Sequence, residues 1–429
     1  MRPLDLRRRS SDEYEPLPLS PVVNEAARRA RAAIERLARS RAISRRDLLQ
    51  SAAASAAVLA ALSACTSEQR ANRGEPAPGT FTVPGSTDTT TASTTTTIDP
   101  EESSNGLDRD DLVVDVQLHF LDPARNTGLG DGFPQASCGL GTRECFAEDV
   151  FLDLVFGQST TRVGVLSGLP IAGADSPLAL DVMDHARDRL TSIGGDRRLL
   201  LQAPVFPATG AMQDVLDGMA ADAAAYPVAA WKTYTHAPTA YRLDDDRGHA
   251  LLSQAVALGR PILAVHKGIA NEDPAASPSD VGPAAAAHPD ATIVVYHSGW
   301  EAGVTEGAYD AGKPADQQRG VDRLLASLNA AGIGTSGNVY AELGSTWFNL
   351  ARSLDDAAHV LGKLLVHLGP QRILWGTDSI WYGSPQGQID AFRAFAISEE
   401  FQERFGYPAL TDETKRLILG GNAARLYGL

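Results

Sequence analysis

Four short apolar runs of the sequence end in residues that can bind metals or transfer protons. His119, His266 and His297 end three of these runs, and Asp378 ends the fourth. Imidazole nitrogens and carboxylate oxygens are ligands for ions such as zinc, and the same groups act as general acids and bases. The four residues therefore predict a metal site or an acid–base site assembled from separate segments.

The runs themselves have the composition of buried β-strands. Each is rich in β-branched and other apolar residues, and each is followed by Gly, Pro or polar residues, as expected where a buried strand enters a loop. They are VVDVQLHF (113–120), ILAVHKG (262–268), IVVYHSGW (293–300) and ILWGTD (373–378). Lys232 and Glu342 lie at the same end of two further apolar runs. Lys232 is a candidate to hold a substrate carboxylate or phosphate-like anion, and the alternative is a lysine that packs its stem beside Trp231.

From residue 112 onward, strand and helix signals alternate. The predicted strands are 112–119, 161–169, 199–206, 228–235, 261–267, 292–298, 338–344 and 372–377. The predicted helices are 178–193, 211–225, 247–258, 320–331, 355–368, 386–404 and 411–419. Eight strands with intervening helices predict an α/β fold, a (β/α)8 TIM-type barrel whose active site lies at the carboxyl ends of the strands. A doubly wound open sheet would need a Gly-rich loop after its first strand, and DVQLHFLDP has none. The long connection 120–160 is expected to form a lid over the barrel mouth.

The N-terminal part differs from the rest in charge. The whole chain of 429 residues has a formal net charge of −15, while residues 1–65 hold 12 Lys and Arg against 7 Asp and Glu. The remainder is therefore strongly acidic, which argues against nucleic acid as a partner. The N-terminal part resembles a twin-arginine export signal that ends in a bacterial lipobox, with Cys65 as the lipidated residue. The resemblance rests on Arg45-Arg46, the Ala/Leu-rich stretch after Ser51 and the residues Leu62-Ser63-Ala64-Cys65. A transmembrane helix and a cytoplasmic Ala-rich helix are the alternatives.

Three regions follow from this division. Residues 1–65 form the signal region, residues 66–106 are expected to be a disordered Ser/Thr/Pro-rich tether, and residues 107–429 form the barrel. This organisation predicts an exported cell-envelope protein attached to the membrane through Cys65. Cys138 and Cys145 remain for a local disulfide in an oxidising compartment, and two unlinked thiols are the alternative.

The order of the motifs resembles the amidohydrolase-related group of the amidohydrolase superfamily. The resemblance covers residues 112–429 and rests on DVQLH, VHKG, YHSG, WGTD and the terminal GGNAARLYGL. It implies a divalent metal, zinc with manganese as the second choice, held by His119, His266, Asp378 and the residue at position 117. It also implies catalytic roles for His297 and Asp378, a small-molecule substrate, and a homodimer as a common state. For Lys232 the family offers a further alternative, a carbamylated lysine that bridges two metals.

Gln117 departs from the family pattern, which has His-x-His on the first strand. An amide oxygen is a weaker ligand for a zinc-like ion than imidazole. Three outcomes therefore stay open: a weakly bound metal, a metal-free hydrolase that uses His, Lys and Asp, and an inactive binding barrel.

The resemblance predicts a hydrolase that cleaves an amide-type or lactone-type bond in a small cyclic or carboxylated compound. A metal-dependent decarboxylase of an aromatic or enoic acid and a non-catalytic ligand-binding lipoprotein are the alternatives. The candidate substrate contacts near strand ends are Trp300, Glu342, Trp347 and Trp381.

Overall fold

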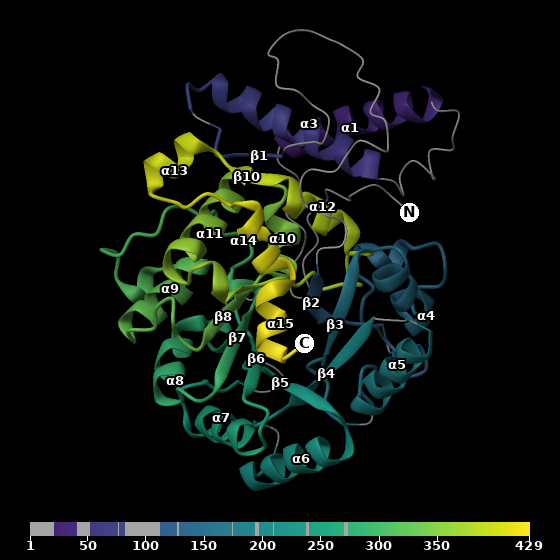
Figure 1. Cartoon of the computed structure of the whole chain (residues 1–429), viewed down its shortest axis with the longest axis vertical. Helices are drawn as coiled ribbons and strands as arrows, with labels where there is room; N and C mark the ends of the chain where they lie inside the picture. The colour runs from purple at the N-terminus through teal and green to yellow at the C-terminus, as the bar shows by residue number, and fades with distance from the viewer. Residues whose placement is uncertain are drawn as a thin grey trace.

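The computed structural model of the chain contains a barrel of eight parallel strands surrounded by helices (Figure 1). It describes residues 21–40, 52–75, 77–81, 112–126, 128–173, 175–193, 197–208, 210–236, 240–269 and 273–429. The strands pair in sequence order, from β2 to β9. They are β2 (Val113–Leu118), β3 (Thr161–Ser167), β4 (Arg198–Val205), β5 (Val228–Tyr234), β6 (Ile262–His266), β7 (Thr292–Tyr296), β8 (Val339–Glu342) and β9 (Ile373–Leu374). The predicted (β/α)8 architecture and all eight predicted strands are confirmed.

The barrel closes between its first and last strands. The backbone N–H of Val116 on β2 donates to the carbonyl of Trp375, 3.0 Å away. Further along, His119 donates to the carbonyl of Ser379 and accepts from the N–H of Ile380. This closure places the end of β2 beside the segment that follows β9, although the two lie far apart in the sequence.

The barrel strands are buried on both faces, which explains their continuous apolar composition. Side chains that include Val116, Val165, Ala264 and Val294 form a cluster of their own. The alternate side chains, such as Val113, Leu166, Val265 and Val295, belong to a second cluster shared with helices. The period-2 alternation of strands thus separates the barrel interior from the layer between sheet and helices.

Helices cover the outside of the sheet. They are α4 (Glu148–Leu152), α5 (Leu180–Ile193), α6 (Met212–Ala225), α7 (Asp246–Ala257), α8 (Val281–Ala287), α9 (Val321–Ala330), α10 (Gly344–Leu350), α11 (Leu354–His367), α12 (Gln386–Ala394), α13 (Glu399–Phe405), α14 (Asp412–Arg416) and α15 (Asn422–Tyr427). Polar caps begin several of them: the Asp245 carboxylate accepts from two N–H groups of α7, and Ser353 caps α11.

The predicted single helix over 386–404 is wrong. The structure divides it into α12, the short strand β10 (Phe395–Ile397) and α13. Ser398 starts α13 because its hydroxyl accepts the N–H of Phe401. The strand exists because β10 pairs with β1 (Gly79–Phe81), a segment distant in the sequence.

The segment before the barrel contains more structure than expected. The predicted tether 66–106 begins inside α3 (Ala52–Ala71) and includes β1, so these parts are ordered, and residues 82–106 lie outside the described residues. Phe81 of β1 packs against Phe395 with ring centroids 5.6 Å apart, and Arg70 forms an ion pair with Asp355 at 2.6 Å. Apolar burial of Phe81 and the Arg70–Asp355 ion pair therefore attach β1 and the end of α3 to the barrel.

The predicted signal region is described only in part. Helix α1 (Pro21–Ser40) packs along α3 above the barrel in Figure 1, and Cys65 is buried within α3. Arg45 and Arg46 lie outside the described residues. In the part of the chain that the structure describes, no helix is both long and apolar enough to cross a membrane.

The long connection between β2 and β3 folds over the carboxyl end of β2. Cys138 and Cys145 are joined by a disulfide within it, which confirms the predicted pairing. Gln135 of this connection donates its backbone N–H to the carbonyl of Trp381, 3.1 Å away. The connection is therefore tied to the segment after β9.

Candidate active site

The strand ends bring the predicted site residues to one edge of the barrel. Gln117 lies on β2, Lys232 on β5 and His266 on β6, while Glu342 ends β8. The remaining members follow directly after strands: His119, His297 and Asp378. All seven side chains are buried. Because the first and last strands of the barrel are adjacent, Gln117 and His119 lie beside Asp378 although they are far apart in the sequence.

Asp378 is the centre of a hydrogen-bonded group. His119 Nε2 lies 3.1 Å from Oδ1 of Asp378, and Gln117 donates its amide Nε2–H to the same oxygen at 2.9 Å. The hydroxyl of Ser345 donates to Oδ2 and also lies 2.8 Å from the hydroxyl of Tyr382. Burial acts to raise the pKa of Asp378, but the hydrogen bonds from His119 and Ser345 and the neighbouring imidazole of His297 outweigh it, so the pKa lies below its ordinary value. Asp378 is therefore an ionised carboxylate with both oxygens in use.

His297 is held in an unusual backbone conformation. His297 and Ser298 have φ values of 60° and 54°, in the left-handed region that favours glycine. Three hydrogen bonds hold the segment: the His297 N–H donates to Oε2 of Glu342 at 3.0 Å, Ser298 Oγ donates to the Glu342 carbonyl, and Thr346 Oγ1 donates to the His297 carbonyl. A strained backbone that several hydrogen bonds hold in place is typical of functional sites.

Three imidazoles face one another beside this segment. The rings of His266 and His297 have centroids 4.8 Å apart, and the ring of His236 lies 4.8 Å from that of His266. Burial lowers the pKa of His297 to about 3 and holds the pKa of His266 well below its usual value. Both rings are therefore neutral at physiological pH.

Lys232 is a fully buried amine. None of the described residues provides a hydrogen-bond partner for its Nζ, which lies 3.2 Å from the ring centroid of Tyr296 and 4.8 Å from that of Tyr234. Burial lowers the pKa of Lys232 well below its ordinary value, while Glu342 and Asp378 act in the opposite direction. An amine in this position is poised to gain an anionic partner.

Glu342 occupies a niche made by two glycines. A Cβ atom on Gly376 would lie 1.8 Å from Oε1 of Glu342, and a Cβ on Gly344 would lie within 3 Å of both carboxyl oxygens. Burial raises the pKa of Glu342 well above its ordinary value, and Oε1 has no hydrogen-bond partner among the described residues. Any larger residue at either glycine would displace this carboxyl group.

These strand-end residues, in this order around a closed barrel, can now be compared with known proteins. A family model described as amidohydrolase matches residues 114–429, which is the barrel almost in full. The chain belongs to the amidohydrolase family. A comparison with curated protein sequences finds no match.

Several solved structures resemble this amidohydrolase-family barrel. A 2,6-dihydroxybenzoate decarboxylase in complex with 2,6-dihydroxybenzoate has 16% identity and a TM-score of 0.46, covering 74% of this chain and 100% of its own. A dihydroxybenzoic acid decarboxylase from Polaromonas sp. JS666, with bound manganese and 2-nitroresorcinol, has 14% identity and a TM-score of 0.47 over 74% and 97%. A protein described as a 2-pyrone-4,6-dicarboxylic acid hydrolase from Pseudomonas putida has 18% identity and a TM-score of 0.41 over 74% and 98%. It is the family match that shows membership.

The ligand set expected for this family does not fit a metal in the observed arrangement. Among the described residues, no three His, Cys, Asp or Glu side chains are grouped so that they could hold a metal ion. His119 and Gln117 are directed at Oδ1 of Asp378, and Ser345 takes Oδ2. The amide nitrogen that Gln117 presents to Asp378 is a donor without a free lone pair. We therefore derive no chemical step through a metal.

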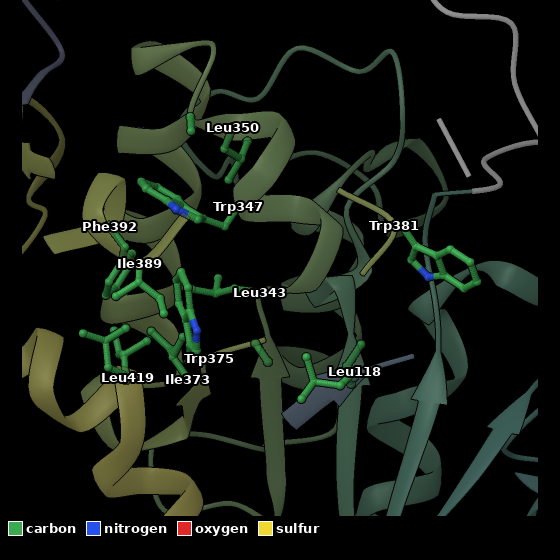
Figure 2. Close-up of a cluster of buried hydrophobic side chains, with 14 of the residues drawn as sticks. Leu118, Leu343, Trp347, Leu350, Ile373, Trp375, Trp381, Ile389, Phe392 and Leu419 are labelled. Atoms are coloured by element: carbon green, nitrogen blue, oxygen red, sulfur yellow. The ribbon is translucent and has the colours of Figure 1, made fainter. Parts of the chain in front are cut away.

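The predicted aromatic contacts need one correction. Trp347 is fully buried on α10, where its Nε1–H donates to the carbonyl of Gln388 and its ring packs against Phe392 (Figure 2). It is a core residue because α10 begins directly after β8, which turns Trp347 outward into the layer between sheet and helices. Trp381 lies well apart from Trp347 in the same view, and its ring stacks on His119 at 5.5 Å.

Three residues of the site were missed in the sequence. His236 follows β5 at the same edge as the predicted histidines, and its place just beyond a predicted strand end could have identified it. Ser345 of α10 donates to Asp378, and Tyr382 from the segment after β9 bonds to the Ser345 hydroxyl. No sequence signal marks these two, because their role depends on the packing of α10 against the barrel edge.

Proposed function

We propose that this amidohydrolase-family protein hydrolyses an ester, lactone or amide bond in a small carboxylated compound at the carboxyl ends of the barrel strands. The observation that carries the proposal is a concentration of buried polar atoms without hydrogen-bond partners among the described residues. They include Nδ1 of His119, Nζ of Lys232, Nδ1 of His266, Nδ1 of His297 and Oε1 of Glu342. Buried polar groups are almost always paired, so such a set at one place calls for a bound polar molecule.

The His119–Asp378 pair supplies the general base. When Nε2–H of His119 donates to Asp378, Nδ1 carries the free lone pair. This nitrogen takes a proton from water as the water oxygen attacks the substrate carbonyl, and Asp378 stabilises the imidazolium that forms. His119 then returns the proton to the departing oxygen or nitrogen, so one water is consumed and the acid and the alcohol or amine are released.

The remaining groups bind the substrate and its developing charge. Lys232 provides a buried amine that becomes a full ammonium when a substrate carboxylate lies beside it. His297, a neutral imidazole, donates a hydrogen bond to the oxyanion that forms on the attacked carbonyl, and its fixed backbone keeps it oriented. These assignments give the strand-end residues distinct roles.

The test is a substrate panel with the purified full chain. It contains lactones, esters and amides that carry a carboxylate, together with aromatic and enoic acids, and it measures both new carboxyl groups and released CO2. We expect hydrolysis that is reduced at least a hundredfold in His119→Ala. Release of CO2 without hydrolysis would establish a decarboxylase instead. Tight ligand binding without turnover would establish a binding protein.

We also propose that the protein is exported and anchored through Cys65. The support is the sequence around Arg45-Arg46 and the small residues before Cys65. Because Cys65 is buried in α3 against α1, its lipidation requires the two helices to separate. Mass spectrometry of the protein from membranes should show an N-terminal diacylglyceryl-cysteine, and an unmodified Cys65 within an uncleaved chain would refute the anchor.

A further inference from the structure

We propose that Gln117 converts the metal position of this family into a metal-free hydrogen-bonded centre, in which Lys232 supplies the positive charge when an anionic substrate binds. The inference deepens the proposed function, because it specifies how the same site is charged. Its decisive measurement is metal binding, which does not depend on the reaction that the site performs.

Donors of the chain already occupy both carboxylate oxygens of Asp378. Oδ1 accepts from Gln117 at 2.9 Å and lies 3.1 Å from His119 Nε2, while Oδ2 accepts from Ser345. A metal ion would have to displace the Gln117 donor and the contact with His119 to reach Oδ1. Charge-assisted contacts of this kind are strong when buried, so both oxygens of the ionised Asp378 are already occupied by donors from within the chain.

The Gln117 amide is oriented so that it offers Asp378 a hydrogen-bond donor. Its nitrogen points to Asp378, and its oxygen lies on the opposite side, where a Cβ on Gly344 would approach Oε1 to 2.3 Å. Glu342 closes that side, because both of its carboxyl oxygens lie within 3 Å of the same point. If the amide turned over, its oxygen would face the ionised Asp378 and lose the hydrogen bond. The orientation that offers a donor is therefore the stable one.

Lys232 is the group of the site that can carry a positive charge in place of a metal ion. Glu342 and Asp378 both act on Lys232, whose Nζ is buried without a hydrogen-bond partner among the described residues. A divalent cation bound at Asp378 would disfavour protonation of this amine in a poorly screened interior. A metal ion and the protonated, substrate-bound form of Lys232 would therefore compete for the charge of the same carboxylate.

The experiment compares metal binding by the wild-type chain and by Gln117→His. Each is purified, dialysed against zinc or manganese and then against buffer, and analysed for metal by mass spectrometry. We expect less than about 0.1 metal per chain in the wild type and about one in Gln117→His, since imidazole provides the lone pair that the amide nitrogen lacks. Bound zinc should also raise the melting temperature of Gln117→His and not that of the wild type.

Matched variants keep the outcome interpretable. Gln202→His changes another buried barrel glutamine, one that bonds to Tyr296 rather than Asp378, and should bind no metal. Gln117→His combined with His119→Ala should lose the gained metal. If Gln117→His does not fold, Gln117→Glu provides a ligand at the same position for the same measurement.

Two results overturn the inference: a wild-type chain that retains stoichiometric metal after dialysis, or a folded Gln117→His that binds no more metal than the wild type. A metal-free wild type that hydrolyses nothing would leave the inference standing and refute the proposed hydrolase. The two ideas therefore fail separately.

Discussion

The Nε2 atom of His119 lies 3.1 Å from Oδ1 of Asp378, across the seam where the first and last strands of the barrel meet. The contact joins residues that are far apart in the chain and depends on closure of the sheet. It orients the imidazole and leaves Nδ1 without a hydrogen-bond partner among the described residues, as the proposed general base requires.

This pairing predicts the effect of Asp378→Asn. The amide would keep the volume of the side chain but not the charge that stabilises an imidazolium, so kcat should fall by roughly a thousandfold with little change in the fold. His119→Ala should cause a similar loss. The double variant should be no slower than the worse single variant, because residues that act as a unit are not additive. Multiplying losses would show that the two residues act independently.

Lys232→Met should weaken substrate binding while it increases the stability of the fold. It removes a buried amine that lacks a hydrogen-bond partner among the described residues, so the free energy of unfolding should rise. The KM for carboxylated substrates should increase by about a hundredfold, since a charged hydrogen bond to the carboxylate is lost.

Lys267→Met is the matched control for this prediction. Lys267 is also fully buried, but its Nζ donates to Asp280 at 2.7 Å. Breaking that pair should lower the free energy of unfolding by about 3–5 kcal/mol. Denaturant unfolding of both variants gives the comparison, and equal destabilisation would contradict the assigned state of Lys232.

Reduction of the Cys138–Cys145 disulfide should loosen the connection between β2 and β3. A loop of this length is expected to contribute about 2–3 kcal/mol through its restraint of the unfolded chain. A reductant, or Cys138→Ser, should therefore lower the melting temperature. Cys65→Ser should leave the response to reductant unchanged, and a response that disappears in that variant would assign the effect to Cys65.

Phe81→Ala tests whether β1 is part of the folded barrel. Phe81 is 5% exposed and packs against Phe395, so its loss should cost about 3 kcal/mol, the lower end for a buried aromatic residue. A chain that begins at residue 107 lacks β1 and the Arg70–Asp355 ion pair and should be less stable still. Thermal unfolding equal to that of the full chain would show that this segment does not contribute.

His359 makes stability depend on acid pH. Burial and nearby Lys363 lower its pKa to about 4, while its Nδ1 lies 2.8 Å from the hydroxyl of Tyr407. The unfolded chain takes up this proton near pH 6.5 and the folded chain only near pH 4, so stability is full above pH 6.5 and falls as the pH decreases towards 4. His359→Gln should reduce that slope by up to about 1.4 kcal/mol per pH unit. An unchanged slope in chemical denaturation would refute the assignment.

The parallel strands were predictable because both of their faces are buried. Runs such as VVDVQL and ILAVH contain few polar residues except at their ends, so the barrel and the edge that carries His119 and His266 could be inferred together. The order of strands then placed Asp378 beside β2.

Other features depend on long-range contacts that local patterns do not contain. Strand β10 forms where β1 pairs with it, and without that partner residues 386–404 have the pattern of one helix. Trp347 is similar: its position after an apolar run indicated a loop, but α10 begins at Gly344 and turns the indole into the core. The direction of the Gln117 amide likewise follows from Asp378 and Gly344, which only the closed barrel brings near it.

Trp381 connects the covering loop to His119, the proposed general base. Its ring stacks on Phe133 at 4.8 Å and lies 5.4 Å from Phe146, and it also stacks on His119. Lifting of the loop would remove packing from one side of Trp381, and the imidazole of His119 would lose a neighbour that orients it. In the proposed hydrolysis, admission of substrate and alignment of the base would then be coupled in one opening step.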